Sequence, residues 1–138
     1  MRLRLASAAA LALLAALALL AACQGDETIS GYAGTDTAWR LVEIDGAPFT
    51  ARAVIRFPEA GQVAGEAPCN TFSGRQSAPY PWFKAEALAV TRRACDALAE
   101  ETRFFAAFGR VSLAEVQGEV LILSDPDGPE MVFERVQP

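Results

Sequence analysis

The chain of 138 residues is long enough to bury the core of one domain and too short for two, because its first 22 residues have the composition of a targeting segment. Removing Arg2 and Arg4 with that segment leaves ten of the twelve basic residues against all seventeen acidic ones, a formal charge of −7. So acidic a chain repels nucleic acid, and the absence of histidine excludes a Ser-His-Asp triad and histidine-based zinc sites.

The N-terminus has the pattern of a bacterial lipoprotein precursor. A basic start precedes an Ala/Leu-rich run over 5–22, and Cys23 follows directly after its small residues. This ending resembles a lipobox, in which cleavage exposes the cysteine for lipidation. The alternative is an uncut transmembrane anchor, but the run lies at the lower length limit for spanning a bilayer. We therefore predict a signal peptide over 1–22 and a lipid on Cys23.

Lipidation of Cys23 would determine the location of the domain in the cell. Two or three acyl chains anchor a protein stably, so we expect the domain to face the periplasm from the cell envelope. Gln24, in place of aspartate, resembles the signal that permits sorting to the outer membrane. Residues 24–36 are small and polar, with several glycines. We predict that 23–36 form the lipidated N-terminus and a flexible linker spanning about 20 Å, and that 37–138 form the folded domain.

From Thr37 onward the pattern indicates short strands separated by turns. Alternating apolar residues predict strands over 39–44, 53–57 and 62–67, and Asp45-Gly46 is typical of a hairpin turn. We expect a further strand over 69–76 and a proline-containing loop over 77–81. Residues 83–91 alternate weakly and are alanine-rich, which leaves helix open beside the preferred strand. The last expected strands cover 111–116, 119–123 and 131–136.

One segment, 96–108, has the pattern of a helix. We expect Asp96 to cap its start and Gly109 to end it, with acidic residues in the first turn. Its predicted buried stripe consists of Leu98, Phe104, Phe105 and Phe108. Later in the chain, the acidic loop 125–127 lacks the further oxygen ligands of a calcium site, so a tight turn is the preferred interpretation.

Cys69 and Cys95 remain as an even pair once Cys23 is lipidated. In an oxidising compartment two nearby thiols usually form a disulfide, which would stabilise the domain by about 3.5 kcal/mol. Two separate buried thiols are the second interpretation. A catalytic thiol ranks third, because no histidine is present to activate it.

Several short motifs follow one another between Trp39 and Arg135. They are Trp39-Arg40-Leu41, Asp45-Gly46, Cys69-Asn70-Thr71-Phe72-Ser73-Gly74, Thr91-Arg92-Arg93-Ala94-Cys95 and Leu121-Ile122-Leu123. The series resembles the META-domain family, which includes heat-inducible lipoproteins. This resemblance implies an α+β fold: a compact, antiparallel, barrel-like and strongly curved sheet with one main α-helix packed against it. It also implies that Cys69 and Cys95 lie close together, and it does not imply an enzyme.

We therefore expect a non-catalytic envelope lipoprotein with an accessory or stress-related role, which binds an envelope protein or a small ligand. We expect a monomeric domain that needs no metal and no cofactor. The candidate binding residues are Asn70, Phe72, Gly74, Thr91 and Arg92. A structural role is the alternative for Asn70, whose amide can bond to its own backbone and shape a turn, and a solvated charge is the alternative for Arg92.

Two other functions stay open at this point. The first is an inhibitor or adaptor that holds an envelope enzyme through the loop 77–82, with Tyr80 and Trp82 as interface anchors. The second is a hydrolase that uses paired carboxylates, either Glu100 with Glu101 or Asp125 with Asp127. Adjacent helical residues point about 100° apart, which disfavours the first of these pairs.

Overall fold

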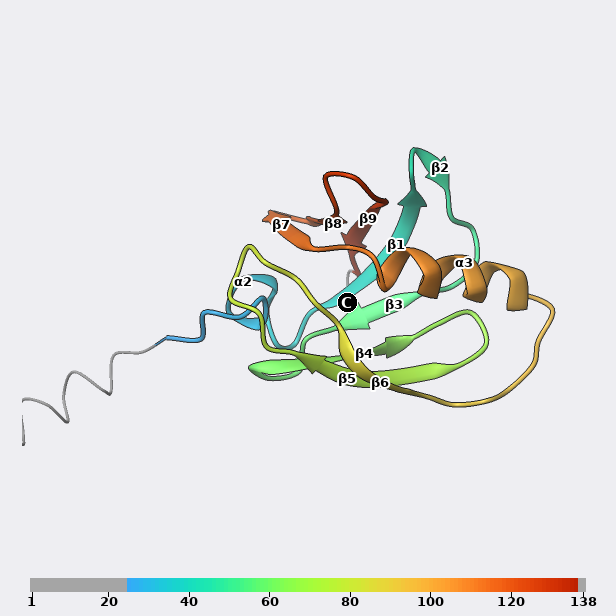
Figure 1. Cartoon of the computed structure of the whole chain (residues 1–138), viewed down its shortest axis with the longest axis horizontal. Coiled ribbons are helices and arrows are strands. Elements are labelled where there is room, and N and C mark those ends of the chain that lie inside the picture. The colour runs from blue at the N-terminus through green and yellow to red at the C-terminus, as the bar shows by residue number, and fades with distance from the viewer. Residues whose placement is uncertain (1–24, 137–138) are drawn as a thin grey trace, which may run out of the picture.

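A computed structural model describes residues 25–136 as a curled antiparallel sheet with one main helix (Figure 1). The short α2 begins the described chain and the longer α3 interrupts the strands. In chain order the elements are α2 (Ser30–Ala33), β1 (Ala38–Ile44), β2 (Ala47–Pro48), β3 (Val54–Arg56), β4 (Gly61–Glu66), β5 (Thr71–Gln76), β6 (Glu86–Val90), α3 (Leu98–Phe108), β7 (Leu113–Gln117), β8 (Val120–Ser124) and β9 (Glu130–Arg135).

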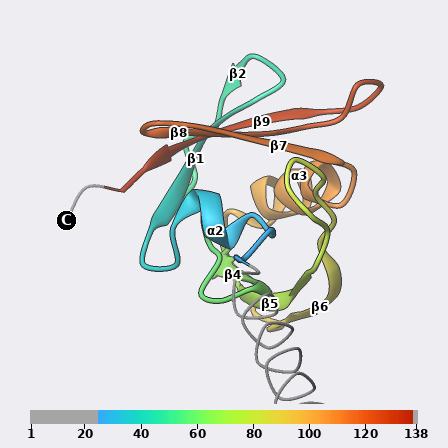
Figure 2. The ribbon, with the colours of Figure 1, turned by 90° about the vertical axis from the view of Figure 1, so that its left-hand side faces the viewer.

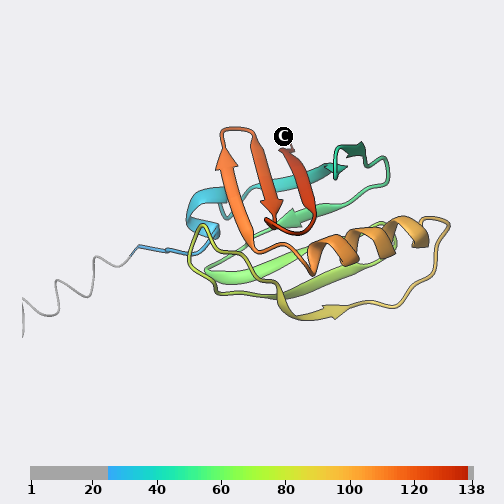
Figure 3. The same cartoon turned by 45° about the horizontal axis from the view of Figure 1, so that its top comes forward.

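The sheet runs in the order β6-β5-β4-β3-β1-β9-β8-β7, with β2 paired to β1. Every neighbouring pair is antiparallel. Figure 2 shows the curl: β7, β8 and β9 lie on one side, β4, β5 and β6 lie on the other, and α3 lies between them. Figure 3 shows α3 beside the strands β5 and β6. The predicted α+β class with a barrel-like, strongly curved sheet is confirmed.

The core fills the inside of this curl. Alternation along β1 buries Trp39 and Leu41, and a bulge between Leu41 and Glu43 turns Ile44 inward as well. From α3, Phe104 and Phe108 approach Phe72 of β5 with ring centroids 5.7 and 5.6 Å apart. Each buried aromatic side chain contributes about 2–3 kcal/mol through removal of its apolar surface from water. These rings join the helix to the sheet.

The two edges of the sheet differ. The outer edge of β7 is covered by residues 81–83, because Phe83 N–H donates to Ser112 O at 2.9 Å and Ala114 N–H donates to Pro81 O at 2.8 Å. β6 ends the sheet order on the other side. Within residues 25–136, no further strand pairs with the outer edge of β6. One edge is therefore protected by the chain itself and the other is open.

Most predicted elements are present with their ends shifted by one to three residues. The strand preferred over helix for 83–91 is confirmed as β6. The Asp45-Gly46 hairpin is also confirmed. Both of its turn residues have positive φ, 52° and 75°, a conformation that glycine adopts without strain and aspartate tolerates. The short β2 that this turn creates was not predicted.

Two details of the helix prediction are wrong. Asp96 does not cap α3, because the helix begins later, at Leu98, with Ala97 in the capping position and no side-chain capping bond. Leu98 N–H instead bonds to the carbonyl of Cys95 at 3.2 Å. Leu98 is 47% exposed and does not belong to the buried stripe. The predicted end at Gly109 is confirmed.

The flexible linker predicted to extend to residue 36 is also wrong for most of its length. Ile29 and Ala33 are 1% and 0% exposed, and Tyr80 N–H donates to Glu27 O at 2.8 Å. Trp39 Nε1–H donates to the carbonyl of Ala33 at 3.3 Å. The segment is ordered because Ile29 adds an apolar side chain to the core and nearby backbone groups find partners. The residues from Glu27 onward therefore belong to the folded domain.

Candidate functional site

The Cys-Asn motif and the Thr-to-Cys motif come together at one end of the molecule. β5 begins at Thr71 and its antiparallel neighbour β6 ends at Val90, so the residues just before β5 lie beside those just after β6. Cys69 and Cys95 form a disulfide, with Cα atoms 5.6 Å apart. The predicted pair is confirmed, and the interpretations as separate or catalytic thiols are wrong.

Asn70 lies at the centre of this arrangement and is 5% exposed. Its Nδ2 donates to Glu101 Oε1 at 2.6 Å and to Arg93 O at 3.0 Å. Its Oδ1 accepts from Arg93 N–H at 2.6 Å and from Thr91 Oγ1–H at 2.9 Å. Both amide hydrogens and both lone pairs are thus used. Asn70 bonds to the backbone of a distant segment, whereas the sequence suggested bonds to its own.

Glu101 has a role that the sequence did not predict, because it was considered there only as a possible hydrolase carboxylate beside Glu100 and for the start of the helix. It projects from the first turn of α3, is 6% exposed, and its Oε2 accepts the N–H groups of Cys69 and Asn70, each at 2.8 Å. One buried carboxylate therefore satisfies the backbone that enters β5 and also holds the Asn70 side chain. The only available signal was a glutamate one turn into the helix that follows the second cysteine. We call Cys69, Asn70, Thr91, Cys95 and Glu101 the Asn70 cluster.

The proposed carboxylate pairs do not converge. Glu100 contacts Arg103 at 3.7 Å on its own helix, whereas Glu101 is directed at the Asn70 cluster. Asp125 accepts the N–H of Asp127 at 3.0 Å and closes its loop, as the turn interpretation predicts. A hydrogen bond from Ser112 lowers the pKa of Asp125, with a smaller contribution from that backbone bond. Glu100 and Asp125 are therefore engaged within their own helix and loop, and Glu101 is engaged in the Asn70 cluster.

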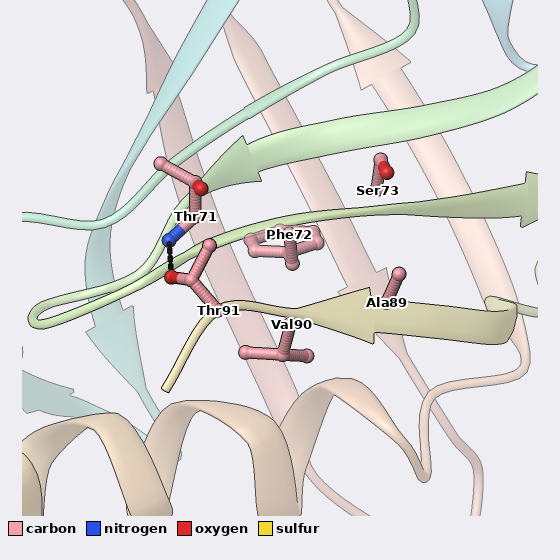
Figure 4. Close-up of a pocket in the computed structure, with 6 residues that line it drawn as sticks. All are labelled: Thr71, Phe72, Ser73, Ala89, Val90 and Thr91. Atoms are coloured by element: carbon pink, nitrogen blue, oxygen red, sulfur yellow. Dashed lines mark hydrogen bonds between the residues drawn. The ribbon is translucent and has the colours of Figure 1, made fainter. Parts of the chain in front are cut away.

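The other candidate residues have separate roles. Thr91 Oγ1 accepts the N–H of Thr71 at 3.1 Å, so it joins the ends of β5 and β6 (Figure 4). Phe72 packs against α3. At Gly74 a Cβ would lie 2.6 Å from Leu88 Cδ2 and 2.7 Å from Glu86 O, so only glycine allows β6 to approach this closely. Arg92 is exposed and is not part of the cluster.

The surface beside the cluster carries an open depression of about 410 Å³. It lies along the adjoining backbones of β5 and β6, and its lining residues are Thr71, Phe72, Ser73, Ala89, Val90 and Thr91 (Figure 4). The adaptor loop lies elsewhere. Its Trp82 is 58% exposed, and Tyr80 is half-buried and stacks on Tyr32 with centroids 4.0 Å apart.

Between Gly25 and Val136, no three His, Cys, Asp or Glu side chains gather as a metal site would require. None of the helices described is both long and apolar enough to traverse a bilayer. The predicted signal peptide over 1–22 and the predicted lipidation residue Cys23 lie outside the described residues.

The chain matches one family model, and its fold is similar to those of solved structures. The family model described as the META domain matches residues 33–138. An NMR structure of a protein from Burkholderia xenovorans is 18% identical, covers 83% of this chain and 93% of its own, and has a TM-score of 0.63. A DUF4847 family protein from Bacteroides vulgatus is 13% identical, covers 77% and 96%, and has a TM-score of 0.60. These two likenesses show the fold alone. No curated protein matches the chain.

Proposed function

The chain belongs to the META-domain family, and we propose that it is a non-catalytic lipoprotein of the bacterial envelope that binds an extended, acidic segment of a partner protein along β6. Cys23 carries the lipid anchor, and the periplasm-facing domain performs the binding as an accessory protein, in keeping with a role under envelope stress. The observation that carries the proposal is the open edge of β6 beside the depression between β5 and β6.

The Asn70 cluster supports the absence of catalysis. A catalytic amide or carboxylate needs a hydrogen-bonding position directed at a substrate, but Asn70 uses both amide hydrogens and both lone pairs within the protein. The Glu101 carboxylate is buried and accepts three protein donors. These motif residues hold the ends of two strands and a helix together. Recognition therefore falls to the surface next to them.

The backbone of β6 supports strand addition. Thr91 N–H bonds to Thr71 O at 3.1 Å, so the alternation along the strand turns the N–H and C=O of Val90 away from β5. Residues 87–91 carry no charge and no proline, the features with which many proteins block an exposed edge. A partner strand can bond to these groups and place alternate side chains in the depression.

Charge selects the kind of partner. Arg75, which pairs in register with Glu86, and Arg92 and Arg93, which follow β6, are all exposed. Glu86 is already neutralised by Lys84 at 2.9 Å. The chain as a whole is acidic, so this local excess of arginine stands out and favours an acidic extended segment.

Site-specific photo-cross-linking in intact envelopes tests the proposal. A photoreactive residue replaces Ala89, which lines the depression, and in a matched control it replaces the exposed Ala60 in the turn before β4. We expect one partner to be captured reproducibly from position 89 and not from position 60, with less capture at high salt. Val90→Pro removes the outward N–H, and we expect it to abolish capture. A Cys23→Ser chain, which is not lipidated, should also lose the partner.

The controls separate binding from folding. Val90→Pro must keep the Cys69–Cys95 disulfide and the circular dichroism of the unsubstituted chain, since the Val90 N–H makes no bond to β5. Equal capture from positions 89 and 60 would contradict binding at β6. Full capture by a folded Val90→Pro chain would contradict strand addition.

A further inference from the structure

We propose that the domain rests on the bilayer through a defined end of the molecule, with Tyr32 and Trp82 placed among the head groups of zwitterionic phospholipids. We call Tyr32, Tyr80 and Trp82 the aromatic end. The inference rests on the proposed lipidation of Cys23 and adds an orientation to it: one face turned toward the membrane, and the β6 edge left to the partner.

Only a few residues separate Cys23 from the part of the chain that the fold holds. Tyr80 N–H donates to Glu27 O at 2.8 Å, and Thr28 pairs with Pro79 in an isolated antiparallel bridge. The fold thus holds the chain from Glu27 onward, four residues after Cys23. Four residues span at most about 14 Å even when fully extended. The end of the domain that carries Glu27 must therefore stay close to the lipid head groups.

The exposed aromatic side chains at that end are of the type found at membrane interfaces. Tyr32 and Trp82 are 52% and 58% exposed, and they are the most exposed large apolar side chains of the described residues. Single exposed apolar residues are common on soluble domains. Here, however, Tyr32 belongs to α2 and Trp82 to the loop whose Pro79 and Tyr80 pair with Thr28 and Glu27, and Figure 1 shows α2 at the side of the domain where the described chain begins. Trp and Tyr are the residues that gather at membrane interfaces, because their rings are apolar and their polar tips stay hydrated.

The aromatic end is also held in place. Tyr32 stacks on Tyr80, whose hydroxyl bonds to Val116 N–H at 3.3 Å. The backbone of Trp82 pairs with Leu113 in a bridge, and its N–H donates to Pro79 O at 2.8 Å. These bonds fix both segments before any contact with lipid, so docking requires little loss of conformational freedom.

Charge decides the lipid class. The first charged residues after Cys23, Asp26 and Glu27, are acidic and exposed, and Lys84, two positions after Trp82, is paired with Glu86. Anionic head groups are repelled by this pair of carboxylates, whereas zwitterionic ones are not. The structure therefore points to a phosphatidylethanolamine or phosphatidylcholine surface, with the hydrophobic rings supplying the attraction.

Tryptophan quenching by lipid tests the docking. The full lipidated chain, cleaved before Cys23, is placed in phosphatidylethanolamine and phosphatidylcholine vesicles that contain lipids with brominated acyl chains. Trp39 is 0% exposed, so the difference between the unsubstituted chain and Trp82→Phe isolates the Trp82 emission. We expect loss of most of that emission and a shift to shorter wavelength. Tyr32→Ser combined with Trp82→Phe should raise the exchange of the amides at positions 80 and 82 with solvent in vesicles.

A relocated reporter provides the matched control. Ala47→Trp in the Trp82→Phe background moves the indole to β2, which Figure 1 shows at the far end from α2. We expect no quenching there. Quenching at both positions, or at neither, would overturn the docking, as would quenching of Trp82 that appears only when phosphatidylglycerol is added.

The mass of the N-terminal peptide separates the two proposals. A peptide without lipid on Cys23 contradicts the anchoring itself and removes this inference with it. A lipidated peptide together with an unquenched Trp82 leaves the anchoring in place and overturns the orientation alone.

Discussion

The two ends of the molecule use polar and aromatic side chains in opposite ways. At the end where α3 begins, polar side chains turn inward: Asn70 and Glu101 are 5% and 6% exposed and every bond they make lies within the protein. At the end that carries α2, aromatic side chains turn outward, and Tyr32 and Trp82 are more than half exposed. The first end stabilises the fold, and the second is available to a partner surface.

This difference shows that a recurring motif need not mark the surface that recognises something. The Cys-Asn and Thr-to-Cys motifs bring together the ends of β5, β6 and α3, and their hydrogen bonds are complete. The surfaces that remain for binding, β6 and the aromatic end, lie beside or away from those motifs. Substitutions at the Asn70 cluster should therefore affect stability, whereas those at the surfaces should affect binding.

The largest expected loss comes from Glu101→Ala. It leaves the N–H groups of Cys69 and Asn70 and the Asn70 side chain without their acceptor in a buried place. We expect the free energy of unfolding to fall by about 3–5 kcal/mol, measured by urea denaturation. Glu100→Ala is the control, because its ion pair with Arg103 is partly solvent-exposed and should change stability by less than about 1 kcal/mol. Equal losses would mean that the buried carboxylate has no special role.

A slightly smaller loss is expected when the disulfide is removed. The crosslinked residues are 26 positions apart, which corresponds to about 3.5 kcal/mol of lost loop-closure entropy in the unfolded chain. We expect Cys69→Ala with Cys95→Ala to lower the unfolding midpoint in urea without abolishing the fold. Adding Glu101→Ala should cost less than the sum of the separate losses, because both changes release the same strand end. Full additivity would show that the bond and the carboxylate act independently.

The smallest expected effect lies at the other end and depends on pH. Hydrogen bonds from Ser30 and then Thr28 lower the pKa of Asp26, which is exposed. A carboxyl whose pKa is lowered by folding stabilises the folded state above its unfolded pKa, and that contribution disappears as the pH falls through its folded pKa. We therefore expect the amides of residues 28–31 to lose protection from hydrogen exchange below about pH 4, while the Asn70 cluster keeps its protection.

Asp26→Asn provides the check on that assignment. The amide cannot titrate, so the protection of residues 28–31 should become independent of pH over the same range. A pH dependence that persists in this variant would assign the effect to another carboxyl.

Local sequence patterns predicted the parts of the fold that depend on near neighbours. Alternation identified β1, β4 and β9, and Asp45-Gly46 identified a hairpin whose two residues have positive φ. Phe104 and Phe108 were correctly placed in the core from helical spacing. In the candidate site, the pairing of Cys69 with Cys95 was predicted, and Asn70 was given a structural alternative, but its side chain bonds to a distant segment and not to its own backbone.

The failures share a cause. Residues 27–36 look like a linker because they are small and polar, but Ile29 is buried against strands far along the chain and Glu27 bonds to Tyr80. The sequence placed Glu101 in the first turn of a helix and considered it beside Glu100 as a hydrolase carboxylate, whereas its role depends on Asn70, 31 residues away in sequence. Pattern rules weigh neighbours within a few positions, so bonds between distant segments escape them.

The sequence by itself determined most of the strands, the main helix, the Asp45-Gly46 hairpin turn and the Cys69–Cys95 disulfide. Each of these rests on short-range periodicity, backbone preference or the number of cysteines. Only the tertiary structure decided which polar groups face inward, which edge of the sheet stays open and that the residues from Glu27 onward belong to the fold. Those properties depend on the curl of the sheet, which brings residues 69–71, 91–95 and 101 together and leaves β6 and the aromatic end exposed. Burying a polar side chain costs free energy unless hydrogen-bond partners replace the water it loses, and here those partners come from distant segments.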